Sequence, residues 1–202
     1  MKHILMIGTG GTSASEMSPD GLTPEISSEQ LLAAVPRIGE LCEVDCLQLY
    51  SLDSTSLRPA HWQGLARAIR ERYDDYDGFV VSHGTDTMAY TAAALSYLIQ
   101  GSPKPIVLTG AQKPIWFDGT DSKRNLIDAF LYACRGCGGV QIVFNGKVIL
   151  GTSAMRYTYE HDNFFENACT DDIINITATV GVDEFNYAIH AVEEIMGFMR
   201  GH

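Results

Sequence analysis

The chain has 202 residues, of which 46% are hydrophobic and 19% charged, and its formal net charge at pH 7 is −11. This composition supports a hydrophobic core and excludes global disorder, and the negative charge argues against nucleic acid or an anionic membrane surface as the main partner. No apolar run is long enough to span a bilayer, and residues 4–7 are too few for the core of a signal peptide. We therefore expect a cytoplasmic protein that contains one large domain.

Apolar runs separated by glycine, proline and polar residues predict alternating strands and helices. Strands are expected at residues 2–8, 44–50, 78–82, 105–109, 140–144 and 147–150. Helices are expected at about residues 27–35, 59–73, 88–100, 121–132 and 183–199. The last two strands are joined by Asn145-Gly146, which is the strongest hairpin signal in the chain.

The repeated strand–helix unit predicts a parallel sheet, because parallel neighbours are joined by helical crossovers. We expect a three-layer α/β fold in which a mostly parallel sheet carries helices on both faces. Residues 1–167 would form this single domain, and residues 168–202 an extension without a second domain, ending in the amphipathic helix at 183–199. Residues 16–26 contain two prolines and a glycine, and we expect a loop there that acts as a lid.

A polar or glycine-rich turn follows each of the first four predicted strands. The carboxyl ends of parallel strands share one edge of the sheet, which is where open α/β sheets bind ligands. We therefore expect one site that gathers Thr12, Ser54, Thr85, Asp86, Ala111 and Gln112. Taken alone, Thr85 or Asp86 could simply cap the helix that follows. The glycine cluster after the first strand fits neither a dinucleotide fingerprint nor a phosphate-binding P-loop.

Four short motifs occur in order at these turns. They are Thr9-Gly10-Gly11-Thr12, Asp53-Ser54, His83-Gly84-Thr85-Asp86-Thr87 and Thr109-Gly110-Ala111-Gln112. Together they resemble the bacterial-type L-asparaginase family over residues 2 to about 167, with the greatest likeness to its cytoplasmic, type I-like branch at residues 73–79, 86–91 and 120–126. The resemblance implies hydrolysis of the side-chain amide of L-asparagine, and sometimes L-glutamine, to the acid and ammonia, without a metal ion or cofactor.

The resemblance also implies a role for each site residue. Thr12 would be the nucleophile, and Thr85 the second catalytic threonine, on the other side of the amide carbon. Asp86 would bind the substrate's α-ammonium group and Ser54 its α-carboxylate, while the Ala111 N–H would bind the developing oxyanion. The implied substrate-binding set is Asp53, Ser54, Thr55, Gly84, Ala111 and Gln112. A threonine hydroxyl is a weak nucleophile at neutral pH, so a base or preorganised donors must activate it.

Two departures from the family pattern affect the catalytic groups. Arg156 stands where the family has a lysine that acts in proton transfer. Arginine keeps the positive charge but does not readily give up a proton, so we place Arg156 in the catalytic set and expect weakened activity. Lys113 or the cluster at residues 160–162 could supply the proton transfer instead. The loop at 16–26 also lacks the tyrosine that many relatives place over the first threonine.

A third departure concerns the domain organisation and leaves two other functions open. Most relatives carry a second, smaller α/β domain, which residues 168–202 do not resemble, and we expect the apolar face of the 183–199 helix to cap this domain or to form a homodimer seam. The chain could instead bind asparagine or aspartate without hydrolysing it. It could also be an amidotransferase subunit that supplies ammonia to charged tRNA, although the −11 charge disfavours this. The sequence does not rank asparagine against glutamine.

The five cysteines occupy positions 42, 46, 134, 137 and 169. Cys134 and Cys137 have the CxxC spacing of redox and zinc sites. No second CxxC motif or histidine pair lies nearby in the sequence, so we expect incidental thiols and no metal site. A reducing cytoplasm fits this pattern best.

Overall fold

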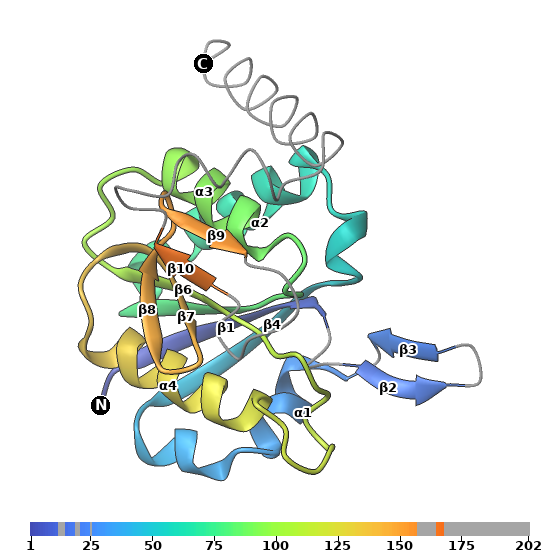
Figure 1. The fold of residues 1–202 in the computed structure, drawn as a ribbon. Helices are drawn as coiled ribbons and strands as arrows, with labels where there is room; N and C mark the ends of the chain where they lie inside the picture. The colour runs from blue at the N-terminus through green and yellow to red at the C-terminus, as the bar shows by residue number, and fades with distance from the viewer. Residues whose placement is uncertain (12–14, 19–20, 25, 157–164, 168–202) are drawn as a thin grey trace.

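The structure is a computed structural model that describes residues 1–11, 15–18, 21–24, 26–156 and 165–167 (Figure 1). The strands are β1 (His3–Gly10), β2 (Ser15–Ser18), β3 (Gly21–Pro24), β4 (Glu43–Leu52), β5 (Gly78–Ser82), β6 (Pro105–Thr109), β7 (Gly139–Phe144), β8 (Lys147–Leu150), β9 (Ala154–Arg156) and β10 (Phe165–Asn167). The α-helices are α1 (Ser28–Ala33), α2 (Pro59–Glu71), α3 (Met88–Leu98) and α4 (Ser122–Arg135). Short 3₁₀ helices span Pro36–Glu40, Ser54–Ser56 and Tyr73–Asp75.

The main sheet has six strands in the order β4-β1-β5-β6-β7-β8. Neighbouring strands from β4 to β7 are parallel, and β8 is antiparallel to β7. Figure 1 shows α2 and α3 over one face of the sheet and α1 and α4 over the other. The predicted three-layer, mostly parallel α/β fold is therefore confirmed.

Each face of the sheet has its own hydrophobic core. The core beneath α2 and α3 buries Trp62 and Phe79, and the core on the opposite face buries Phe130 of α4. All five residues of β5 are buried, as expected for an apolar strand covered on both faces. This burial fixes the carboxyl end of β5, and with it the turn that follows, in the middle of the sheet edge.

The capping box and the hairpin turn that the sequence predicts are both present in the structure. α1 begins with a capping box, in which Ser27 Oγ accepts the Gln30 N–H at 3.4 Å and Gln30 Oε1 accepts the Ser27 N–H at 2.8 Å. Asn145 and Gly146 have φ angles of 47° and 73° and form the two-residue turn that joins β7 to β8.

The region predicted to be a loop at 16–26 contains regular structure. Strands β2 and β3 pair antiparallel from Ser15 opposite Pro24 to Ser18 opposite Gly21, and Figure 1 shows this hairpin projecting from the body of the fold. Pro24 occupies the last pair, where a missing N–H does not interrupt the ladder, so the prolines and glycine that favoured a loop do not prevent pairing. The action of this segment as a lid stays a prediction.

Other parts of the chain add to or fall outside the predictions. β9 and β10 form an antiparallel pair that the sequence did not predict. The extension at 168–202, with its expected helix at 183–199, lies outside the described residues. Among the helices that are described, none combines the length and the apolar character needed to cross a membrane.

Candidate active site

The turns after β1, β4, β5 and β6 meet at one edge of the sheet. A Cβ atom built on Gly11 would lie 2.4 Å from the backbone nitrogen of Gly84, and one built on Gly84 would lie 2.6 Å from Ser54 Oγ. A Cβ atom on Gly110 would lie 2.2 Å from the carbonyl oxygen of His83. Only glycine permits such close approach of one backbone to another. The parallel sheet thus brings the four polar turns together, and glycines line their contacts.

Ser54 is held in a buried position between these turns. Its side chain and backbone are only 2% exposed, and its carbonyl oxygen accepts a hydrogen bond from Thr87 Oγ1 at 2.9 Å. Asp53 and Thr55 are exposed, and Asp53 Oδ1 accepts hydrogen bonds from Thr55 N at 2.8 Å and Thr55 Oγ1 at 2.7 Å. Ser54 Oγ has no hydrogen-bond partner among the described residues. A buried hydroxyl of this kind is suited to a polar ligand.

Thr85 and Asp86 follow β5 and precede the N-cap of the next helix. The N-cap of α3 is Thr87, whose hydroxyl bonds to Ser54 and not to the first turn of its own helix. Thr85 is buried, with 4% of its surface exposed, and Asp86 is partly buried. Thr87, rather than Thr85 or Asp86, therefore occupies the N-cap position, and both residues lie one or two positions from the close contact between Gly84 and Ser54.

His83 belongs to a buried hydrogen-bond chain that the sequence analysis did not assign. Trp62 Nε1 donates to Thr91 Oγ1 at 2.9 Å, Thr91 Oγ1 lies 2.8 Å from His83 Nε2, and His83 Nδ1 lies 2.6 Å from the Gly84 carbonyl oxygen. Because a carbonyl oxygen can only accept, the ring proton resides on Nδ1 and Thr91 donates to Nε2. The chain thus ends on the peptide group that links Gly84 to Thr85.

We expect the free energy of unfolding to decrease in acid because of His83. Complete burial lowers the pKa of His83 from 6.5 to about 4. The unfolded chain then binds the proton at a higher pH than the folded chain, so this contribution is present above pH 6.5 and is lost as the pH falls toward 4, by about 3 kcal/mol in total. Urea unfolding at pH 7 and pH 4 should show a smaller pH effect for His83→Gln. An equal pH effect in the two proteins would contradict this assignment.

The turn after β6 contains a buried backbone at Ala111 and a buried side-chain nitrogen at Gln112. Ala111 is 1% exposed, and Gln112 is partly buried. The Nε2 atom of Gln112 is buried and has no hydrogen-bond partner within the described part of the chain. Lys113, which the sequence suggested as an alternative group for proton transfer, is exposed.

Three of the predicted groups are described incompletely or not at all. Thr12 and the cluster at 160–162 lie outside the described residues. Arg156 is the last residue of β9, where it pairs with Phe165 of β10. β9 contacts α3, the helix that begins two residues after Asp86, and Figure 1 shows the two side by side.

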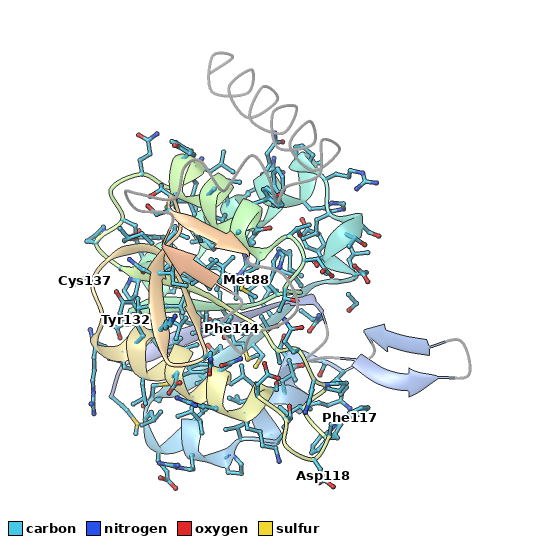
Figure 2. All side chains as sticks on the ribbon, viewed as in Figure 1. Met88, Phe117, Asp118, Tyr132, Cys137 and Phe144 are labelled. Carbon is cyan, nitrogen blue, oxygen red and sulfur yellow. The ribbon has the colours of Figure 1, made fainter. Side chains whose placement is uncertain are left out.

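The four described cysteines form no recognisable metal site with other described residues. Figure 2 places Cys137 at the end of α4 that lies opposite the Asp118 loop. Cys42, Cys46, Cys134 and Cys137 are free thiols, and burial raises the pKa of Cys42 to about 12 and that of Cys46 to about 11. Across the described ranges, no group of three or more His, Cys, Asp or Glu side chains could hold a metal ion. The polar edge of the sheet is therefore the candidate site.

Comparison with known families decides the ancestry of this site. A family profile described as Asparaginase, N-terminal, matches residues 3–187. This chain belongs to the asparaginase family. The profile covers all four polar turns, including Thr12, which is outside the described structure.

The similar proteins include two L-asparaginases and a subunit of an amidotransferase. The chain is 37% identical over 171 residues to the L-asparaginase of Thermococcus kodakarensis, an alignment that covers 84% of this chain and 52% of the relative. It is 36% identical over 170 residues to L-asparaginase 1 of Escherichia coli K12, covering 82% and 49%. It is 35% identical over 149 residues to a glutamyl-tRNA(Gln) amidotransferase subunit of Archaeoglobus fulgidus, covering 73% and 35%.

A solved asparaginase structure shares the fold. The thermostable L-asparaginase from Thermococcus kodakarensis superimposes with a TM-score of 0.75 at 36% identity, covering 82% of this chain and 51% of that chain. The likeness to L-asparaginase 1 agrees with the type I-like branch predicted from the motifs. The present chain spans about half the length of the L-asparaginases that it matches.

Proposed function

We propose that this asparaginase-family chain hydrolyses the side-chain amide of L-asparagine to L-aspartate and ammonia. The observation that carries the proposal is the buried Ser54 hydroxyl, which has no hydrogen-bond partner among the described residues and lies in close contact with Gly84, with Thr85 and Asp86 next along the chain. A hydroxyl donor and a carboxylate on adjoining turns suit a zwitterionic amino acid better than an apolar ligand. The similarity to two proteins named L-asparaginase supports the same substrate.

In this proposal the edge of the sheet first binds the amino-acid part of the substrate. The Asp86 carboxylate pairs with the α-ammonium group, and Ser54 Oγ donates to the α-carboxylate. The hydrogen bonds between Asp53 and Thr55 hold the 3₁₀ turn that presents Ser54. Because Ser54 is buried, the bond that it makes to a charged group is stronger than it would be in water.

Hydrolysis then proceeds through a covalent intermediate. Thr12 Oγ gives up its proton as it bonds to the amide carbon, and the carbonyl oxygen becomes an oxyanion that accepts a hydrogen bond from the Ala111 N–H. The carbon–nitrogen bond breaks as the nitrogen takes up the proton released by Thr12 and leaves as ammonia, and water then cleaves the ester, yields the L-aspartate side-chain carboxyl group and restores the Thr12 hydroxyl. Thr85 acts on the other side of the amide carbon. A preorganised oxyanion donor typically contributes about 10²–10³-fold in rate.

The arginine at position 156 leads to a specific prediction about kcat. We expect Arg156→Lys to raise kcat for L-asparagine by about 10²-fold, because a lysine can exchange a proton where an arginine cannot, and general acid–base catalysis contributes ~10²–10⁴-fold. Ammonia release by the two proteins measures the change. An unchanged or lower kcat would show that position 156 does not limit proton transfer. Lys113→Gln would then test Lys113, the alternative group for proton transfer.

The same ammonia assay tests the proposed reaction and its substrate preference. L-Asparagine and L-glutamine are supplied separately, and the amino-acid product is identified. We expect L-aspartate and ammonia in equal amounts. Binding of L-aspartate in a calorimeter without ammonia release from either amide would instead support a binding protein whose catalytic groups have decayed.

A second candidate function follows from the likeness to the glutamyl-tRNA(Gln) amidotransferase of Archaeoglobus fulgidus. In that role the same site would release ammonia for a partner that acts on charged tRNA. The net charge of −11 opposes direct contact with nucleic acid. Binding of tRNA at low salt, alone or with a co-purified partner protein, would favour this role over a free-standing hydrolase.

We also infer a cytoplasmic homodimer. The four described cysteines are free thiols, which suits a reducing compartment. Trp116 and Phe117 are exposed on the loop after the Ala111 turn, and exposed aromatic side chains are common at protein interfaces. Light scattering should give twice the 22.1 kDa mass of the chain. A monomer mass at working concentrations would contradict the dimer.

A further inference from the structure

The Asp121 carboxylate has unusual hydrogen-bond partners for a residue at the start of a helix. It precedes α4 at the N-cap position, where an aspartate ordinarily accepts a hydrogen bond from the first turn of its own helix, but it makes no such bond here. Its Oδ1 and Oδ2 atoms lie 3.1 and 2.9 Å from the Gln112 nitrogen, and Oδ1 lies 3.1 Å from the Lys113 nitrogen. Thr120 Oγ1 accepts the Ser122 N–H instead. The Asp121 carboxylate therefore accepts hydrogen bonds from the turn after β6 and not from its own helix.

Asn125 lies one helical turn further along α4 and holds the same turn from the other side. It is 1% exposed, and its Nδ2 donates to the Gly110 carbonyl oxygen at 2.9 Å and to Asp121 Oδ2 at 3.2 Å. Its Oδ1 accepts the Asn145 N–H at 2.9 Å. A carbonyl oxygen on one side and a backbone N–H on the other fix the orientation of this amide.

These contacts determine the orientation of the peptide groups around Ala111. The Gly110 carbonyl and the Ala111 N–H belong to one planar trans peptide unit and point in opposite directions. The bond from Asn125 to Gly110 therefore fixes the direction of the Ala111 N–H and, by polarising the peptide, makes it a better donor. The next peptide unit carries the Gln112 N–H, which Asp121 holds. The two peptide units that flank Ala111 are thus held by Asp121, just before α4, and by Asn125 in its first turns.

The two ends of the loop between this turn and α4 are joined by a hydrogen bond, and the tip of the loop is exposed. Thr120 Oγ1 donates to the Lys113 carbonyl oxygen at 3.1 Å and closes the neck of the loop. Figure 2 shows Phe117 and Asp118 at its tip, on the outside of the fold. Asp118 is exposed, so it offers an aspartate in the same loop that lies outside the clamp on Ala111.

We propose that Asp121 and Asn125 are positioning residues that aim the Ala111 N–H at the reacting carbonyl oxygen. This proposal rests on the proposed amide hydrolysis, in which the Ala111 N–H stabilises the oxyanion. An oxyanion donor acts mainly in the transition state, so loosening its support lowers kcat more than it raises KM. Neither Asp121 nor Asn125 touches the substrate in this account.

The test compares Asp121→Asn with the matched control Asp118→Asn. The Asp121→Asn variant keeps the size of the side chain but sets an amide where a carboxylate accepts backbone N–H groups. We expect its kcat for L-asparagine to fall by about 10–100-fold with KM changed less than threefold, and Asp118→Asn to match the wild type. Asn125→Ala should lower kcat in the same way, and the loss in the double variant should be smaller than the product of the two single losses.

A second readout keeps this proposal separate from the hydrolysis itself. The Ala111 amide signal, followed by NMR after ¹⁵N-alanine labelling, should move in Asp121→Asn and Asn125→Ala and stay in place in Asp118→Asn. If the wild type releases no ammonia, the hydrolysis fails and this signal alone decides the positioning role. An unmoved Ala111 signal, or a kcat loss shared equally by Asp118→Asn, would overturn the proposal.

Discussion

Replacing Thr85 with alanine is expected to lower kcat/KM for L-asparagine by about 10²–10⁴-fold, because it removes the second catalytic hydroxyl and a general acid–base group typically contributes a factor of this size. The thermal unfolding midpoint should stay close to that of the wild type, because Thr87 and not Thr85 occupies the N-cap of α3. Ammonia release and a thermal scan on the same preparation measure both quantities.

Thr85→Ser is the control for this prediction, since it keeps the hydroxyl and removes only a methyl group. It should retain much more activity than Thr85→Ala. Near-normal turnover by Thr85→Ala would show that Thr85 has no catalytic role. Equal losses in the two variants would show that packing around the buried side chain matters more than the hydroxyl.

Replacing Gly11 with alanine is expected to destabilise the folded chain by about 2–4 kcal/mol and to abolish activity. Gly11 has a φ angle of 92°, which an alanine adopts only at a cost, and its Cβ would lie 2.4 Å from the backbone nitrogen of Gly84. Because the obstacle is backbone, the turns after β1 and β5 must move apart, and overpacking of this kind typically costs about 1–3 kcal/mol in addition. Urea unfolding measures the change.

Gly39→Ala is the matched control for Gly11→Ala. Gly39 is an exposed residue of the 3₁₀ helix Pro36–Glu40, and a Cβ there would meet nothing within 4 Å. This variant should be as stable as the wild type or slightly more stable, since alanine reduces the entropy of the unfolded chain. Equal stability of Gly11→Ala and Gly39→Ala would contradict the close packing of the turns at the sheet edge.

The fold was predictable because its signals are local. The apolar run of β5, the Asn145-Gly146 turn and the Ser27–Gln30 capping box each depend on a few neighbouring residues. The convergence of the four polar turns followed from the parallel sheet alone, because the turns after parallel strands share an edge. The hairpin at β2 and β3 was missed because prolines and a glycine within it favour a loop unless their places in the ladder are known.

The parts of the site that the sequence did not predict depend on distant partners. Burial lowers the pKa of His83, and Thr91 and Trp62, on two different helices, complete the hydrogen-bond chain in which its Nδ1 is directed toward Gly84. Asp121 has the residue type and position of an ordinary helix cap. Only the three-dimensional structure shows that its carboxylate accepts the Gln112 N–H. Propensity and spacing identify such residues as polar and close to the sheet edge. They do not show which backbone groups these residues bind through hydrogen bonds.

The most direct test of the proposed function is to incubate the chain with L-asparagine and hydroxylamine and to measure ammonia and β-aspartyl hydroxamate together. Attack by a threonine nucleophile forms an ester that hydroxylamine intercepts, so the wild type should yield both products and Thr12→Ala neither. Hydroxamate formation that survives in Thr12→Ala would contradict the assigned nucleophile. Absence of both products in the wild type, despite binding of L-aspartate, would contradict the hydrolysis itself.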